Sequence, residues 1–313
     1  MTVRTSDTPA AAVAYPTTAS ARGGQTSSPT RIYALMLAPA LTLFAVFILV
    51  PVALTVTGSL FEFGLTSPTW EFAGLGNFAK AANDPVFWLS LRNNLIFVFG
   101  SIILQIGAGT ILAAILDRGI RRGSTLLRTI IFAPMVVSAV AVGLIWLMIL
   151  DPNVGALNAI VKGVGLTPPL RGWLGDPNVA IWILLIVAAW QYTGFMMVLV
   201  LAGLQGVPAE IYQAAALDGA RGVRAFWYIT LPSIRNILIV AALITTIGAF
   251  KAFDIIYVTT QGGPANATQV LGTYIYLQAF GIGNMGYADA LAVVLLIIAL
   301  ILGWLQIRYS RRA

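Results

Sequence analysis

The sequence contains neither cysteine nor histidine in its 313 residues. Without cysteine the chain cannot form a disulfide, a thiolate nucleophile or a zinc–thiolate site. Without histidine it lacks the commonest general base and the commonest metal ligand. An intramembrane enzyme would have to build its catalytic pair from a few Asp, Glu, Ser and Lys side chains. We therefore expect no catalytic residue and no metal in this chain.

Charged residues are also scarce. They make up only 9% of the chain, against 59% hydrophobic residues and a mean hydropathy of +0.89, whereas soluble proteins carry about 25% charged residues. This composition predicts an integral membrane protein. The formal net charge is +7, but the basic residues are scattered between apolar segments, which argues against a nucleic-acid partner.

Residues 1–30 are rich in Ala, Thr, Ser, Pro and Gly and show no apolar periodicity, so they predict a disordered tail. A signal peptide is the alternative, but the apolar segment that follows is too long for one. Six apolar segments have the ~20-residue length that crosses a bilayer. They predict an all-α, polytopic membrane protein whose transmembrane domain covers residues 31–313. The predicted spans are residues 32–57, 95–116, 130–150, 179–204, 237–258 and 287–307.

The distribution of Lys and Arg predicts the orientation. Most of the 18 basic residues lie before the first span, between the second and third, between the fourth and fifth, and after the last. Because cytoplasmic loops carry the excess of positive charge, both termini and residues 207–232 are predicted to be cytoplasmic. The opposite face would hold aromatic loops and a Gly-Pro turn at residues 261–264. Those loops are either contacts for an extracytoplasmic partner or aromatic residues at the membrane interface.

Small and polar residues inside the spans suggest two roles. Gly109 with Ala113, and Ala139 with Gly143, have the spacing that lets helix backbones approach closely. Polar residues at membrane depth usually face a cavity or the bundle interior; they include Gln105, Thr245 and Thr246. A sugar site needs aromatic faces for the pyranose rings together with hydrogen-bonding groups for the hydroxyls. The candidate substrate path is Trp190, Gln191, Tyr192, Phe250, Lys251, Phe253, Asp254 and Tyr257. Hydrogen bonding between helices explains each of these residues equally well.

The sequence does not predict a nucleotide-binding site. Residues 281–286 spell GxGxxG, but a dinucleotide site requires a preceding strand and a surrounding soluble βαβ unit. Here an external loop precedes the motif and a predicted span follows it. The chain has no Gly-Lys dipeptide, so it cannot form a P-loop.

Residues 207–232 form the one substantial segment in which small residues, charges and aromatics replace apolar sequence. Pro208 and Glu210 suit the start of a short helix over 209–217, and Gly219 suits the left-handed position after its end. A second short helix is expected over residues 221–230, ended by Leu231 and Pro232. The alanines leave a shallow surface that another protein can approach, whereas a helix resting on lipid would want bulkier apolar residues and more lysine.

This segment resembles the EAA loop of binding-protein-dependent ABC importers, whose pattern is EAA-x3-G-x9-I-x-L-P. The match runs from Gln213-Ala214-Ala215 through Gly219 to Ile229, Leu231 and Pro232. Gln213 stands where the family has Glu, which keeps hydrogen bonding but removes a charge that Glu210 is placed to supply. The resemblance implies that the following residues couple to an ATPase: Glu210, Tyr212, Gln213, Ala214, Ala215, Asp218, Gly219, Ala220, Phe226, Leu231 and Pro232.

Further motifs resemble the carbohydrate-uptake branch, the maltose- and glycerol-3-phosphate-type permeases. They lie at residues 128–134, 145–158, 201–205 and 253–268. The resemblance implies the type I importer permease fold in the cytoplasmic membrane of a prokaryote, and alternating access for a sugar or sugar-like solute. Its implied partners are a second homologous permease subunit, two ATP-binding cassette ATPases that bind ATP and Mg²⁺, and an extracytoplasmic solute-binding protein. No cofactor is expected in this chain.

An ion-coupled secondary transporter is the alternative function. Such a protein would be expected to carry carboxylates at membrane depth for ion coupling. Asp254 and Asp289 lie only near the predicted external ends of their spans.

Overall fold

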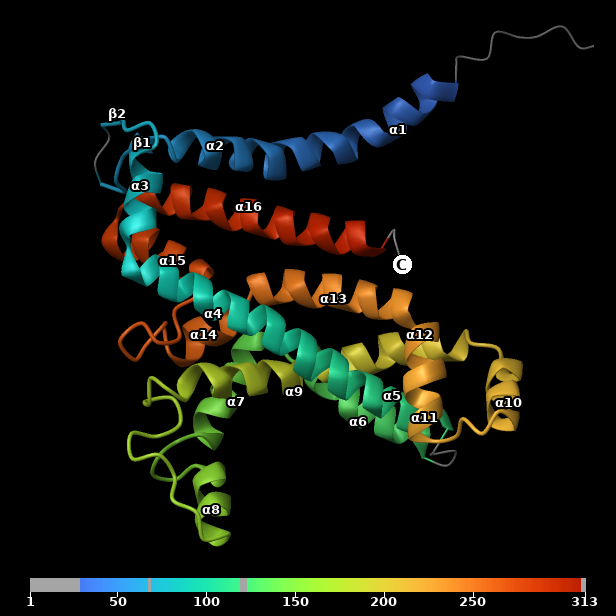
Figure 1. Cartoon of the computed structure of the whole chain (residues 1–313). Helices are drawn as coiled ribbons and strands as arrows, with labels where there is room; N and C mark the ends of the chain where they lie inside the picture. The colour runs from blue at the N-terminus through green and yellow to red at the C-terminus, as the bar shows by residue number, and fades with distance from the viewer. Residues whose placement is uncertain (1–28, 67–68, 119–122, 311–313) are drawn as a thin grey trace, which may run out of the picture. The chain divides into compact units, whose positions relative to one another are not determined.

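The computed structural model describes residues 29–66, 69–118 and 123–310 (Figure 1). Most of the predicted tail, residues 1–28, lies outside the described residues. The chain divides into two compact units, residues 1–52 and 53–313. The described part of the first unit is helical. Its elements are α1 (Pro29–Phe44), the π-helical segment η1 (Ala45–Leu49) and the start of α2 (Val50–Gly58).

In the described part of the second unit, the regular secondary structure is helical apart from one short antiparallel β-hairpin, and loops join these elements. The hairpin pairs β1 (Phe61–Glu62) with β2 (Glu71–Phe72), with Phe61 opposite Phe72. The helices are α3 (Gly76–Asn83), α4 (Pro85–Ser101), η2 (Ile102–Ile106), α5 (Gly107–Arg118), α6 (Ser124–Val136), α7 (Ala139–Ile149), α8 (Ala156–Gly163), α9 (Ala180–Gln205), α10 (Ala209–Leu217), α11 (Val223–Ala225), η3 (Phe226–Thr230), α12 (Leu231–Ser233), α13 (Arg235–Phe250), α14 (Asp254–Thr259), α15 (Leu271–Tyr276), η4 (Leu277–Ile282) and α16 (Met285–Ser310).

Five helical stretches among the described residues are long and apolar enough to cross a membrane, and a bent pair makes up to six. The five are Tyr33–Gly58, Pro85–Asp117, Ala180–Gln205, Arg235–Thr259 and Met285–Arg308. They coincide with five of the predicted spans, and one boundary differs clearly. The second begins at Pro85 rather than at residue 95, because Asp84 caps the helix by accepting a hydrogen bond from the Val86 amide at 2.8 Å.

The third predicted span, residues 130–150, is not one straight helix. It consists of α6 and α7, which meet at an angle of 99°. Pro134 weakens the end of α6, because proline donates no backbone hydrogen bond. Ser138 then starts a new helix, since its hydroxyl accepts a hydrogen bond from the Ala141 amide at 3.3 Å. Because both halves of this stretch are apolar, its hydropathy does not reveal the break.

Helix α9 lies at the centre of the second unit and packs against α5, α6 and α13 (Figure 1). Glycines allow close helix contacts in this unit, both between α5 and α9 and between α7 and α14. A Cβ atom on Gly109 would lie 2.9 Å from Cβ of Met196 in α9, and one on Gly143 would lie 3.2 Å from Val258. The predicted close helix contacts at Gly109 and Gly143 are therefore confirmed.

The loop between α14 and α15 is anchored to α4 by two buried asparagines. Asn93 donates to the carbonyl oxygens of Ala267 and Gln269 at 2.9 and 2.8 Å, and Asn94 accepts from the Leu271 amide at 2.7 Å. The loop contains the predicted turn, with Gln261 at φ 53°. These hydrogen bonds satisfy backbone carbonyl and amide groups of the loop that have no partner within a helix.

Asp84 joins three helices at the end of the bundle that carries α14 and the hairpin (Figure 1). Its carboxylate accepts hydrogen bonds from the hydroxyls of Tyr274 in α15 and Tyr287 in α16. Burial acts to raise the pKa of Asp84, but the bonds from Tyr274, Tyr287 and the Val86 amide outweigh burial and hold the pKa below 3.8. Burial and the same carboxylate raise the pKa of Tyr274 to about 12, so its hydroxyl stays a donor.

Replacing Asp84 by alanine is expected to destabilise the detergent-solubilised protein by about 2 kcal/mol or more, because a helix cap is lost and two hydroxyls lose their acceptor. The temperature of half-aggregation measures this change. Since the folded pKa of Asp84 is lowered, its contribution is present above about pH 4 and lost as the pH falls further.

Asp151→Ala is the matched control, because among the described residues the Asp151 carboxylate accepts hydrogen bonds only from the nearby amides of Asn153 and Val154. Equal shifts for the two variants would contradict the assignment of a joining role to Asp84.

Candidate transport cavity and coupling loop

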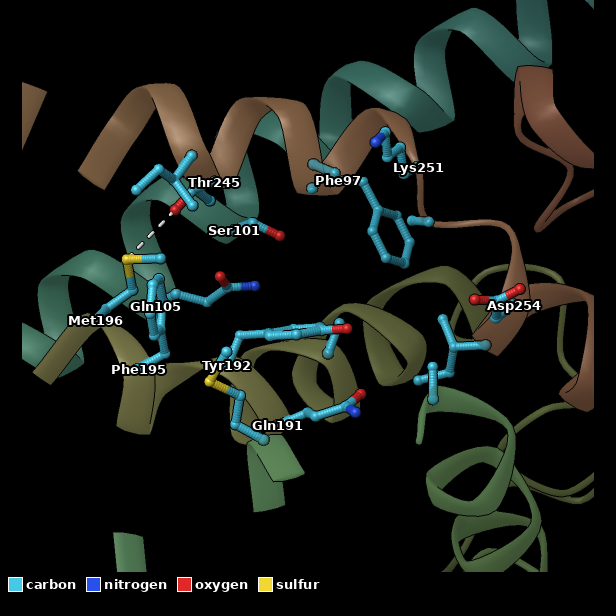
Figure 2. A pocket seen from close by; sticks show the side chains of 18 residues that line it. Phe97, Ser101, Gln105, Gln191, Tyr192, Phe195, Met196, Thr245, Lys251 and Asp254 are labelled. Atoms are coloured by element: carbon cyan, nitrogen blue, oxygen red, sulfur yellow. Dashed lines mark hydrogen bonds between the residues drawn. The ribbon is translucent and has the colours of Figure 1, made fainter. Parts of the chain in front are cut away.

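A cavity of about 420 Å³ opens beside α9 (Figure 2). Its volume falls in the ~300–1,000 Å³ range of small-molecule sites. Apolar and small residues form most of the wall: Phe97, Met135, Ala139, Ala188, Phe195, Met196, Ile244, Gly248, Ala249, Ala252 and Ile255. The polar lining is Ser101, Gln105, Gln191, Tyr192, Thr245, Lys251 and Asp254. An apolar wall with a few polar groups is the composition of a site that orients an uncharged polar ligand.

Gln191 connects the cavity to the break between α6 and α7. Its side-chain amide donates to the carbonyl oxygen of Val137 at 3.0 Å, an oxygen that the break deprives of a helical partner. The Gln191 side chain is only 2% exposed, and its Oε1 atom has no hydrogen-bond partner in the structure. Gln191 thus stabilises the bend and forms part of the cavity lining, while its unpaired Oε1 atom is itself buried.

The two charged groups of the cavity flank a second interruption, between α13 and α14. Lys251 follows the last residue of α13, and Asp254 begins α14. Both side chains are exposed and line the cavity with Tyr192, which projects from α9 (Figure 2). One positive and one negative group at the same wall leave its formal charge balanced.

The structure brings together half of the predicted substrate path. Gln191, Tyr192, Lys251 and Asp254 line the cavity. The other four do not: Phe250 lies in the core at 9% exposure, Trp190 packs edge-on against Trp146, and Phe253 stacks on Tyr257.

Sequence reasoning missed the contribution of the second span. Phe97, Ser101 and Gln105 are spaced four residues apart and line the cavity from α4 and η2. Residues four apart share one helix face, so this spacing was the available signal. The polar pattern does indicate that Gln105 and Thr245 face a cavity or the bundle interior, but the predicted path includes neither of them. The Thr245 hydroxyl lies 3.6 Å from the sulfur of Met196.

The coupling loop, residues 207–232, lies at the other end of α13 from the cavity's charged pair (Figure 1). Its first helix, α10, has the predicted bounds, and Gly219 follows it with φ 79°. Ala215 is buried, while the polar side chains of Glu210, Gln213 and Asp218 are exposed. Tyr212 and Ala220 are half-buried beside them.

The second helix of the loop differs from its prediction. It begins at Val223 rather than at residue 221, because Gly222 has φ 55°. It also continues past Leu231 and Pro232, through α12 to Ser233. Pro232 follows closely on the π-helical segment η3, near the end of this helix.

Comparison with known proteins identifies the family. Residues 85–313 match the family described as the binding-protein-dependent transport system inner membrane component. A probable ABC transporter permease from Bacillus subtilis, YurN, is 39% identical and covers 88% of this chain and 95% of its own. The lactose permease LacF of Rhizobium radiobacter is 34% identical (88% and 93%), and the trehalose/maltose permease MalF of Thermococcus litoralis is 37% identical (86% and 90%).

A solved bacterial alginate ABC transporter shares the fold, with a TM-score of 0.79 at 22% identity, covering 91% of this chain and 95% of that one. The chain therefore belongs to the inner membrane components of binding-protein-dependent transport systems. It is an ABC transporter permease, a multi-pass protein of the cytoplasmic membrane, and ATP hydrolysis belongs to a separate subunit. Within the described ranges, no group of three acidic side chains is placed to hold a metal ion.

Proposed function

We propose that this chain carries a sugar or sugar-like solute through the membrane by alternating access. The cavity beside α9 is the observation that supports this proposal, because its largely apolar wall carries amide and hydroxyl groups and one charged group of each sign. The names of the lactose and trehalose/maltose permeases point to the same class of solute.

We further propose that residues 207–232 dock on an ATPase subunit. The exposed Glu210, Gln213 and Asp218 would meet it, while the buried Ala215 holds α10 to its own chain. ATP binding would close the ATPase dimer, and the helix pair would pass that movement to the bundle. The resemblance supports a second, homologous permease subunit and a solute-binding protein on the opposite face.

The proposed orientation puts both termini and the coupling loop in the cytoplasm. It requires an even number of spans, so the bent pair α6–α7 must count as one span, together with the five long helices. The distribution of basic residues supports this orientation.

The test is uptake of radiolabelled lactose, maltose and trehalose by cells that express the complete transporter. Gln191→Leu is expected to reduce uptake of the carried sugar about tenfold or more, since it removes an amide from the cavity lining and leaves the Val137 carbonyl unpaired at the α6–α7 bend. Uptake that survives ATP depletion but stops with an ionophore would contradict the proposal and favour an ion-coupled transporter.

Trp190→Phe is the matched control. Trp190 neighbours Gln191 in α9, but its ring packs against Trp146 and does not line the cavity. We expect uptake by this variant within about twofold of the unaltered transporter, because the aromatic contact is kept. Equal losses in the two variants would show that general packing, and not the cavity, limits transport.

A further inference from the structure

Four aromatic side chains form a continuous row beside the cavity. Phe253 and Tyr257 are stacked, with ring centroids 5.0 Å apart and planes inclined by 14°. Tyr276 lies 5.5 Å from Phe253 and 4.9 Å from Tyr257. Phe280 extends the row, 5.1 Å from Tyr276. Two separate segments build it: α14 with its N-cap residue Phe253, and the helix formed by α15 and η4.

The row runs from the surface toward the cavity. Phe280 is 58% exposed and Tyr276 is 38% exposed, whereas Phe253 and Tyr257 are half-buried. Phe253 stands between Ala252 and Asp254, and both of these neighbours line the cavity. The backbone at the inner end of the row is therefore continuous with the cavity wall, while the Phe253 ring itself stacks on Tyr257.

The row lies on the side of the protein from which the solute would enter. Helix α13 begins just after the coupling loop, and α14 lies beyond the other end of α13 (Figure 1). If the coupling loop faces the ATPase, the row lies on the opposite face, where a binding protein would release its solute.

From this arrangement we infer that the row is a binding path for saccharide rings. The path leads from the external surface to the cavity. The inference rests on the proposed function. Aromatic faces bind the C–H surfaces of pyranose rings, and the hydroxyls of Tyr257 and Tyr276 supply polar groups along the same line. The occupant is a neutral saccharide in transit; lipid and the second permease subunit are the occupants that the experiment must exclude.

The first measurement uses uptake by the complete transporter with whichever of lactose, maltose and trehalose it carries. Phe280→Leu and Tyr276→Leu are each expected to raise the half-saturating concentration about twofold to tenfold. Ile282→Leu changes an exposed residue of the same segment that lies outside the row, and it is expected to stay within about twofold. Unchanged half-saturation in both Phe280→Leu and Tyr276→Leu would overturn the inference.

The second measurement uses the absence of cysteine from the chain, which makes any introduced cysteine unique in it. Phe280→Cys is expected to react with an external methanethiosulfonate reagent in the assembled transporter, and to react at least about threefold more slowly when the carried sugar is present. Ile282→Cys is the control, because Ile282 is 62% exposed in the same segment but is not in the row. Its reaction should not depend on sugar.

The outcomes separate the two proposals. Failure of the unaltered transporter to take up any of the three sugars overturns the proposed function and this inference together. Normal uptake with an unreactive Phe280→Cys shows that lipid or the second subunit covers the row, and it overturns the inference alone. Normal uptake together with a Phe280→Cys reaction rate that does not depend on sugar also overturns the inference alone.

Discussion

Replacing Gly219 by proline is expected to reduce solute uptake to background while the chain still inserts and assembles. Gly219 has φ 79°, and proline is locked near φ −65°. The turn after α10 would therefore have to rebuild, which displaces the helix pair that we propose docks on the ATPase. Uptake and solute-stimulated ATP hydrolysis by the complete transporter measure the effect, and the amount of chain in the membrane fraction shows whether it assembles.

Gly165→Pro is a closely matched control. Gly165 also has φ 79°, no neighbouring atom within 4 Å of a built Cβ, and an amide that donates to the carbonyl oxygen three residues before it. Gly219 shares all three properties, but Gly165 follows α8, at the other end of the bundle. We expect near-normal uptake from Gly165→Pro. Normal transport by Gly219→Pro would contradict the coupling role of the loop.

Replacing Gly194 by leucine is expected to remove most of the folded protein from the membrane. A Cβ atom at Gly194 would lie 2.7 Å from Cα of Phe132 and 2.8 Å from the carbonyl carbon of Ile131. These are backbone atoms of α6, so α6 and α9 would have to separate. Overpacking of this kind costs about 1–3 kcal/mol or more, and losses of this size change cellular abundance several-fold.

Gly303→Leu controls for the change of residue type within a long apolar helix. Gly303 lies in α16 with no atom within 4 Å of a built Cβ. Fluorescence-detected size-exclusion chromatography of tagged chains measures the folded amount. We expect a near-normal peak for Gly303→Leu and a several-fold smaller one for Gly194→Leu. Equal peaks would show that α6 can move away from α9 at little energetic cost.

The sequence predicts the parts of this fold that local patterns determine. Apolar length is enough to find the long helices, and the Asp218-Gly219 pair is enough to end α10. The 99° bend between α6 and α7 escapes prediction, because both halves are apolar and the stabilising group, Gln191, is distant in the chain. A bond between residues 137 and 191 leaves no periodic signal.

The candidate cavity shows the same division. Its polar residues are visible in the sequence as interruptions of apolar spans, and Gln191, Tyr192, Lys251 and Asp254 were selected on that basis. Their aromatic neighbours were assigned to the same site, because sequence adjacency does not show which way a side chain faces. The structure instead places Phe253 and Tyr257 in the aromatic row and Phe250 in the core. Whether any of these residues contacts the solute stays a prediction.

Helix α9 spans 26 residues without a break, from Ala180 to Gln205. It carries Gln191 at the cavity and ends just before the coupling loop. At 1.5 Å per residue, the distance along the axis from Gln191 to Gln205 is about 21 Å. A rigid tilt of about 5° around the loop end would shift the cavity wall by about 2 Å. Because Gln191 also holds the α6–α7 bend, that tilt would act on the bend and the cavity at once.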